Sequence, residues 1–313
     1  MTTASPLYIG IEIGGTKLQV VAGDHEGNII DRVRCAVNAE QGAVHIQQQI
    51  EQGVQQLQQQ HKIAAIGVGF GGPVDWQSGA IQLSHQVGGW ENVNLIHWLH
   101  QITGLPVAVD NDANTAALGE AINGSGKGYK NVFYITIGSG IGGGLVINQR
   151  VYHGRIPGEV EIGHVRLNKK GETVEQCCSG WAVNKMVSAY IAQHPNSKLA
   201  ELAGNNDVPG AYLLRPAIEA NDTDAMDLLA TVADDLAFAL SHIVHLFNPD
   251  VIILGGGLSL MGDILTAPLT ERLPHYIMQA LLPIPPVLIA GLKEDAVPAG
   301  ALHLAQRSIV GCQ

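Results

Sequence analysis

Val107-Ala-Val-Asp-Asn-Asp-Ala-Asn-Thr-Ala-Ala-Leu-Gly-Glu120 joins two local patterns within one stretch. Its first three residues form a short apolar run after a proline, which predicts a buried strand. Its second half is rich in good helix formers, and Asp110, Asn111 and Asp112 separate the two patterns. A strand that runs directly into a helix places such side chains at the carboxyl edge of a sheet, where open α/β folds bind ligands.

Asp112 admits two interpretations at this junction. The first is a helix N-cap, a common position for aspartate before an apolar helix. The second is a general base, because phosphoryl transfer to an alcohol needs an acceptor for the hydroxyl proton. The choice depends on whether the rest of the chain contains groups that bind phosphate.

Composition limits the class of protein. The chain has 313 residues, of which 46% are hydrophobic, and a net charge of −11, so we expect two globular domains. The acidic charge argues against nucleic-acid binding. We expect no signal peptide and no apolar run of membrane-spanning length. The four cysteines include an adjacent pair, Cys177 and Cys178, which is a poor disulfide framework and favours a reducing cytoplasm.

Hydrophobic patterns along the chain alternate between strand and helix periods, which predicts an α/β layer fold. The expected strands cover residues 7–13, 18–22, 29–34, 64–70, 107–112, 131–137, 145–147, 251–254 and 283–290. The expected helices cover residues 46–60, 113–120, 180–192, 222–247 and 296–307. The stretch 194–216, with its Pro, Asn and Gly residues, has no clear period.

Three glycine turns follow predicted strands, at residues 14–15, 138–144 and 255–257. Glycine lets backbone N–H groups approach an anion closely. The first turn alone is typical of a plain hairpin. The second is too dense in glycine for that and favours a phosphate or nucleotide role. Because both follow the order strand, turn, strand, we expect two copies of one unit that face each other across a cleft.

A glycine-flanked polar stretch, residues 158–164, contains Glu161 and His164 three positions apart. This pattern is compatible with an ordinary surface loop. It is also compatible with hydrogen bonding to sugar hydroxyls, for which a carboxylate and an imidazole are suitable partners.

Together, these motifs resemble those of the sugar-kinase/actin/heat-shock ATPase superfamily and, within it, the ROK family of sugar kinases and repressors. The resemblance covers about residues 7 to 305 and rests on the three glycine turns, on Val109-Asp-Asn-Asp-Ala-Asn114 and on Glu161-Ile-Gly-His164. It implies two ribonuclease-H-like (actin-like ATPase) domains with the active site in a cleft between them. We expect residues 1–112 with 296–313 to form the smaller domain and residues 113–295 the larger. Because the first strand begins near residue 7, we expect no N-terminal helix-turn-helix.

The resemblance also implies a role for each matching residue. Asp112 corresponds to the catalytic base. The expected sugar ligands are Gly71, Gly72, Asn111, Asp112, Glu161 and His164. The expected contacts to ATP are Gly14, Gly15, Thr16, Lys17, Thr136, Gly138, Ser139, Gly140, Gly255, Gly256 and Gly257.

Three departures from the family pattern bear on function. Glu12 replaces the usual aspartate, keeping a charge for a water-mediated Mg²⁺ contact. The family's zinc cysteines correspond to Val174, Gln176 and Trp181, so we expect no structural zinc. The family's second sugar glutamate corresponds to Val183, so that contact is lost or is supplied by a neighbour such as Asn184.

The resemblance implies a cytoplasmic, homodimeric hexose kinase that uses ATP and Mg²⁺ and acts on a glucose-like sugar, at O6. A fructokinase or N-acylhexosamine kinase remains an alternative. A further alternative keeps the fold but loses turnover, giving a sugar-sensing regulator. A polyphosphate donor is disfavoured, because 17 Lys and Arg residues against 28 Asp and Glu residues leave no excess of basic groups for a polyanion.

Overall fold

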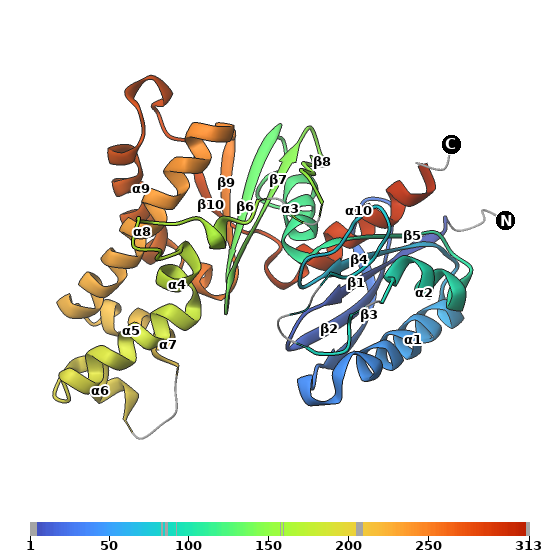
Figure 1. Ribbon diagram of the computed structural model, residues 1–313, viewed down its shortest axis with the longest axis horizontal. Helices are drawn as coiled ribbons and strands as arrows, with labels where there is room; N and C mark the ends of the chain where they lie inside the picture. Colours follow the sequence, from blue (N-terminus) through green and yellow to red (C-terminus); the bar gives the residue numbers. More distant parts are fainter. Residues whose placement is uncertain are drawn as a thin grey trace. The chain divides into compact units, whose positions relative to one another are not determined.

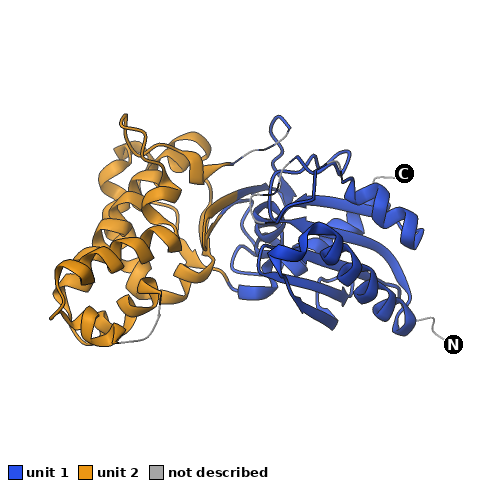
Figure 2. Cartoon of the chain, turned by 60° about the horizontal axis from the view of Figure 1, so that its bottom comes forward, with its two compact units in different colours: residues 1–134, 144–160, 291–313 blue, residues 135–143, 161–290 orange. Residues whose placement is uncertain are grey.

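The computed structural model describes residues 5–82, 84, 87–91, 93–156, 158, 160–204 and 209–310. The chain divides into two compact units, which are drawn in different colours in Figure 2. Unit 1 contains residues 1–134, 144–160 and 291–313, and unit 2 contains residues 135–143 and 161–290. The predicted domain boundaries at residues 112 and 296 stay a prediction.

Unit 1 is built on a mixed five-stranded sheet with the order β3-β2-β1-β4-β5 (Figure 1). The first three strands are antiparallel, and β1, β4 and β5 are parallel. This is the predicted ribonuclease-H-like arrangement. The strands are β1 (Leu7–Ile13), β2 (Lys17–Gly23), β3 (Ile29–Ala36), β4 (Ile63–Phe70) and β5 (Val107–Asn111).

Alternation along β1 explains how helices cover both faces of this sheet. Ile9 and Ile11 are fully buried in a core that includes residues of α1 (Gly42–Gln60) and α2 (Leu95–Thr103). Gly10 points the other way, where an added Cβ would lie 2.7 Å from the carbonyl oxygen of Pro298. The helices that contact this second face are α3 (Asp112–Ile122) and α10 (Ala296–Val310).

The second sheet has the order β10-β9-β6-β7-β8. Its strands are β6 (Asn131–Ile137), β7 (Ile141–Ile147), β8 (Arg150–Val151), β9 (Val251–Gly255) and β10 (Val287–Ile289). The last strand is shorter than the predicted 283–290. The helices of unit 2 are α4 (Val174–Cys178), α5 (Gly180–Gln193), α6 (Lys198–Ala203), α7 (Gly210–Glu219), α8 (Thr223–Phe247) and α9 (Asp263–Arg272).

The long helix α8 is the core helix of unit 2 and contacts α4, α7 and α9. It corrects the expectation that no apolar run reaches membrane-spanning length, because it is long and apolar enough to cross a bilayer. However, 56% of its apolar window is buried inside the structure. Packing within unit 2 therefore accounts for its apolar character.

Candidate active site

Asn111, not Asp112, is the N-cap of helix α3. Its Oδ1 accepts hydrogen bonds from the backbone N–H groups of Ala113 at 2.9 Å and Asn114 at 3.3 Å. The N-cap interpretation of Asp112 is therefore wrong. Asp112 is the first residue of the helix, and its Oδ1 accepts from the N–H of Ala113 at 2.8 Å. The positive end of the helix dipole at this position favours an ionised carboxylate.

Gly71 brings the Asp112 carboxylate and the first glycine turn together. Its N–H donates to the carbonyl oxygen of Ile13 at 2.8 Å. A Cβ added to Gly71 would lie 3.4 Å from Asp112 Oδ2 and 3.6 Å from the Cα of Gly14. Gly14, Gly15 and Gly71 also line the same small hollow. The predicted base and the predicted phosphate turn therefore lie within a few ångströms of each other in unit 1.

The turn containing Asn111 is held from two sides. Its side-chain amide donates to the carbonyl oxygen of Gly72 at 3.2 Å. Its backbone N–H donates to the buried carboxylate of Asp110 at 2.8 Å, and that carboxylate also pairs with His153 Nε2 at 2.8 Å. The His153 ring stacks on Trp76 with a centroid distance of 4.1 Å. Sequence reasoning missed Trp76 and His153, since no local pattern distinguishes them.

Glu12 is mostly buried at the start of the first turn, and burial raises the pKa of its carboxyl group. It accepts a hydrogen bond from Gln19 at 2.7 Å and pairs with Lys17 at 3.4 Å, and both contacts oppose that rise in pKa. A single carboxylate held in this way fits a water-mediated contact to Mg²⁺, and not an all-protein cage.

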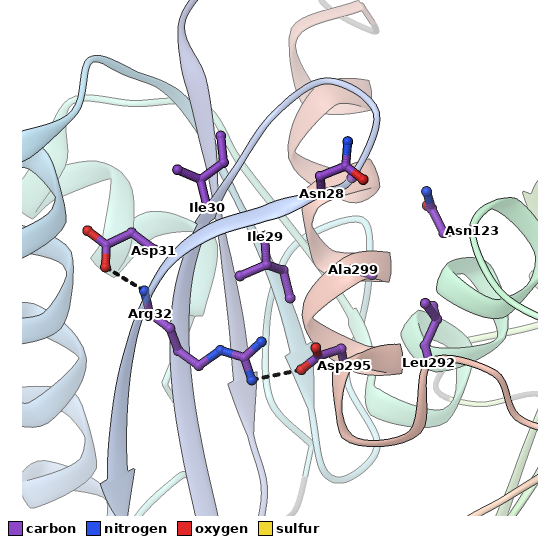
Figure 3. A pocket seen from close by; sticks show the side chains of 10 residues that line it. Asn28, Ile29, Ile30, Asp31, Arg32, Asn123, Leu292, Asp295 and Ala299 are labelled. Carbon is purple, nitrogen blue, oxygen red and sulfur yellow. Dashed lines mark hydrogen bonds and ion pairs between the residues drawn. The ribbon is translucent and has the colours of Figure 1, made fainter.

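Gln19 connects Glu12 to a network of ion pairs on unit 1. Its Oε1 accepts from Arg32 at 2.8 Å, and Arg32 pairs with Asp295 at 2.7 Å (Figure 3). Arg32 and Asp295 line a pocket of about 620 Å³ in which no predicted site residue lies. The network explains how a fully buried glutamine is tolerated beside Glu12.

The second glycine turn contacts the start of α5, and the third packs against the end of β6, the strand that leads into the second turn. The N–H of Gly180 donates to the carbonyl oxygen of Gly138 at 2.7 Å. Gly256 has a positive φ of 79°, and an added Cβ would lie only 2.5 Å from the backbone of Ile137. By contrast, a Cβ at Gly257 would meet nothing within 4 Å, and one at Gly138 only a carbonyl oxygen at 4.0 Å. This open backbone fits the approach of nucleotide phosphates.

Glu161 and His164 lie at the two ends of a short turn of 3₁₀ helix, η2 (Ile162–His164). Both are exposed, and within the described parts of the chain neither side chain has a hydrogen-bond partner. The turn itself is fixed, because a Cβ at Gly163 would lie 2.2 Å from the carbonyl oxygen of Ile141. The two polar groups therefore project from a rigid backbone.

Val183, where this chain departs from the family pattern, and its neighbour Asn184 both have structural roles here. Val183 is fully buried in α5. Asn184 Oδ1 accepts from the N–H of Ala211 at 2.7 Å and so holds the start of α7. The sugar contact that the family makes at position 183 is either lost here or supplied by Asn184. Because the Asn184 amide oxygen already binds Ala211, this geometry favours the loss of the contact.

The adjacent cysteines, Cys177 and Cys178, lie on α4. Cys178 is buried, with Sγ 3.9 Å from the carbonyl oxygen of Val232, and burial raises the pKa of its thiol. Cys177 is half-buried. The described residues contain no cluster of three or more His, Cys, Asp or Glu side chains that could hold a metal ion. The expectation of no structural zinc stays a prediction.

Comparison with known proteins decides the family. The family model of the ROK family matches residues 8–308. The chain belongs to the ROK family. This ROK protein is 30% identical to the glucokinase of Thermotoga maritima over 311 residues, which cover 97% of this chain and 98% of that protein. It is 31% identical to the glucokinase of Halalkalibacterium halodurans, with 96% and 95% covered.

Solved structures of ROK proteins also resemble the fold of this chain. A ROK family glucokinase from Streptomyces griseus, solved in complex with glucose and AMPPNP, matches this ROK protein with a TM-score of 0.83 at 29% identity. The match covers 96% of this chain and 99% of that one. The predicted α/β fold class, of the two-domain actin-like ATPase kind, is confirmed.

Proposed function

We propose that this ROK protein is an ATP-dependent hexose kinase that phosphorylates a glucose-like sugar at O6, with Asp112 as the general base. The observation that carries the proposal is the position of the Asp112 carboxylate beside Gly71 and the first glycine turn. A base next to backbone that can receive phosphate is the arrangement that phosphoryl transfer to a hydroxyl requires.

In this proposal, Asp112 Oδ2 accepts the proton of the attacking hydroxyl, while Oδ1 stays anchored to the N–H of Ala113. Asn111 is the N-cap, and its hydrogen bond from Ala113 fixes the start of the helix and so the position of the Asp112 carboxylate. The backbone of the Gly14–Gly15 turn stabilises negative charge on the transferred group. ATP would supply that phosphoryl group and leave as ADP, and Mg²⁺, with a water held by Glu12, would offset the charge.

In unit 1, the proposed sugar-binding residues besides Asp112 are Gly71, Gly72 and Asn111. In unit 2, they are Glu161 and His164. Support for the second pair comes from their exposed polar groups on a fixed turn. Support for glucose as the substrate comes from the names of the two glucokinases to which the chain is similar.

The test is a coupled assay of ADP release with a panel of hexoses, applied to the wild-type chain and to Asp112→Asn. Asparagine keeps the shape but cannot take a proton, so we expect kcat to fall roughly 10²- to 10⁴-fold while sugar binding persists. Asp227→Asn, which changes an exposed aspartate on α8, is the matched control and should leave kcat unchanged. An Asp112→Asn variant with more than about a tenth of wild-type kcat would exclude Asp112 as the base.

The same assay distinguishes the alternatives. Turnover with fructose or an N-acylhexosamine, and not with glucose, would reassign the substrate. No ADP release with any hexose, despite calorimetric binding of a sugar, would identify a sugar-sensing regulator. The buried Val183 gives that second possibility its basis, because one expected sugar contact is missing.

A further inference from the structure

A large cavity of unit 1 lies along β5, the edge strand of the first sheet. It has a volume of about 1140 Å³, and its walls come from β5, α10, the β7–β8 hairpin and the loop after β4. None of the residues assigned above to the sugar, the nucleotide or the base lines it. It is therefore a separate cavity, although Asp110 at one end of it is next to Asn111.

Two arginines without a carboxylate partner line this cavity. Arg307 is half-buried and donates to the carbonyl oxygen of Gln149, and Arg150 is exposed on β8. Among the described residues, no carboxylate lies within ion-pair distance of either guanidinium. Burial first, and then the charge of Arg150, lower the pKa of Arg307. Two like charges that share a cavity favour the binding of an anion between them.

Trp76 contributes to the cavity wall. Its ring is held by stacking on His153, with a centroid distance of 4.1 Å. Its Nε1 is buried out of reach of solvent and has no hydrogen-bond partner among the described residues, so it does not serve as a donor to a group in the cavity. The arginines are therefore the groups that would hold an anion there.

The one carboxylate in the cavity is already satisfied. Asp110 accepts from the N–H of Asn111, from Asn114 and from His153. It therefore has no need of the arginines. The remaining wall is largely apolar, with Ile96, Val107, Val109 and Leu304 among its residues.

We propose that this cavity is a second binding site, for a phosphate group carried by a small ester or present as free phosphate. Two guanidinium forks match the several terminal oxygens of a phosphate better than the two of a carboxylate. The apolar wall would accommodate the uncharged body of an ester. The site goes beyond the proposed kinase activity, since it would be filled while sugar and nucleotide are bound.

The experiment is a calorimetric titration of the full chain already saturated with glucose and a nonhydrolysable ATP analogue. The titrants are inorganic phosphate, glucose 6-phosphate and, as a carboxylate of similar charge, succinate. We expect one further site for phosphate or its ester. Tighter binding of glucose 6-phosphate would identify an ester as the ligand, and equal binding would identify free phosphate.

Two variants locate that site. Arg150→Gln removes an exposed charge, and Arg307→Lys keeps the charge without the fork. Each should weaken the additional binding by roughly tenfold. Lys62→Gln, an exposed residue of unit 1 outside the cavity, should leave it unchanged. Melting temperatures close to wild type would show that the variants are folded.

Absence of any further binding in the saturated protein would overturn the proposal. So would binding that both variants retain in full, because the phosphate would then lie elsewhere. Succinate bound as tightly as phosphate would show that the cavity selects negative charge alone, and the assignment to phosphate would be wrong.

Discussion

In unit 1, the candidate catalytic group is held by many neighbours, whereas in unit 2 the candidate sugar-binding groups are held only through their backbone. Asp112 is anchored to Ala113 and lies against Gly71, and the adjacent Asn111 makes hydrogen bonds on both sides. Glu161 and His164 project from a clamped turn with exposed side chains.

This difference agrees with the demands of the two tasks. A general base must be oriented before the reaction, because small displacements of reacting groups are costly to rate. A recognition group can complete its hydrogen bonds when the ligand arrives, provided that its backbone is already in place. Mutations in unit 1 should therefore affect kcat most, and mutations at the two groups of unit 2 should affect sugar affinity most.

Gly71→Ala should lower kcat more than either substitution at the two groups of unit 2. The new Cβ would lie 3.1 Å from the carbonyl oxygen of Ile13 and 3.4 Å from Asp112 Oδ2, so either the turn or the carboxylate must shift. We expect kcat to fall about 100-fold. Steady-state kinetics would measure it, and Gly88→Ala, whose Cβ meets nothing within 4 Å, provides the steric control. A Gly71→Ala variant with unchanged kcat would show that Asp112 is not tightly constrained.

Glu161→Gln and His164→Ala should weaken sugar binding about 5- to 150-fold, because each leaves a sugar hydroxyl without a partner. Binding of a nonhydrolysable ATP analogue should change little. Calorimetric titration with each ligand separately measures both effects. Glu271→Gln, at an exposed position on α9, should affect neither ligand. Equal weakening of sugar and nucleotide would indicate damage to the fold of unit 2 and would contradict the division of roles.

Acidification should destabilise unit 1 through His303. Burial first, and the nearby charge of Arg307, lower the pKa of His303 from 6.5 to about 4. Between these two values the unfolded chain binds the proton and the folded chain does not, so stability falls as the pH decreases through this window. The loss is about 1.4 kcal/mol per pH unit for one such group. Melting temperatures at pH 7 and pH 5 would measure it.

His303→Gln should reduce that acid sensitivity, because glutamine does not titrate. His25→Gln, which changes an exposed histidine of unit 1, should leave the sensitivity unchanged. If the melting temperature of both variants decreased between pH 7 and pH 5 by as much as that of the wild type, His303 would not be the group responsible.

Removal of metal should have the smallest effect. The expected zinc positions are Val174, Gln176 and Trp181, so incubation with a chelator should leave the melting temperature unchanged. Elemental analysis should find well under one zinc per chain. About one equivalent of zinc, lost on substitution of Cys177 or Cys178, would contradict this and indicate an unfamiliar site.

Sequence patterns predicted the first sheet well because its strands are apolar and its turns are rich in glycine. They also predicted the junction of β5 and α3, although they offered Asp112 as the cap where the structure has Asn111. Both residue types are strong N-caps, and only the backbone at residue 111, which is still extended, separates them.

Tertiary contacts explain what the sequence could not predict. Helices α6 and α7 fall largely in the stretch 194–216, where Pro and Gly obscure the period. The start of α7 depends on a distant partner, Asn184, which no local pattern could indicate. The stacked pair of Trp76 and His153 joins residues far apart in the chain, so its role beside Asp110 became visible only in the fold.

Helix α10 determines when, during synthesis, one face of the first sheet can be fully covered. Its backbone lies so close to β4 and α3 that a Cβ at Gly67 would be 1.9 Å from the carbonyl oxygen of Ala301, and one at Gly300 would be 1.8 Å from that of Thr115. Thr115 belongs to the helix that begins with Asp112. The part of this face of β1 and β4 that α10 covers is therefore exposed on a nascent chain until residues 296–310 have been synthesised. During that interval, protein quality control can act on these strands.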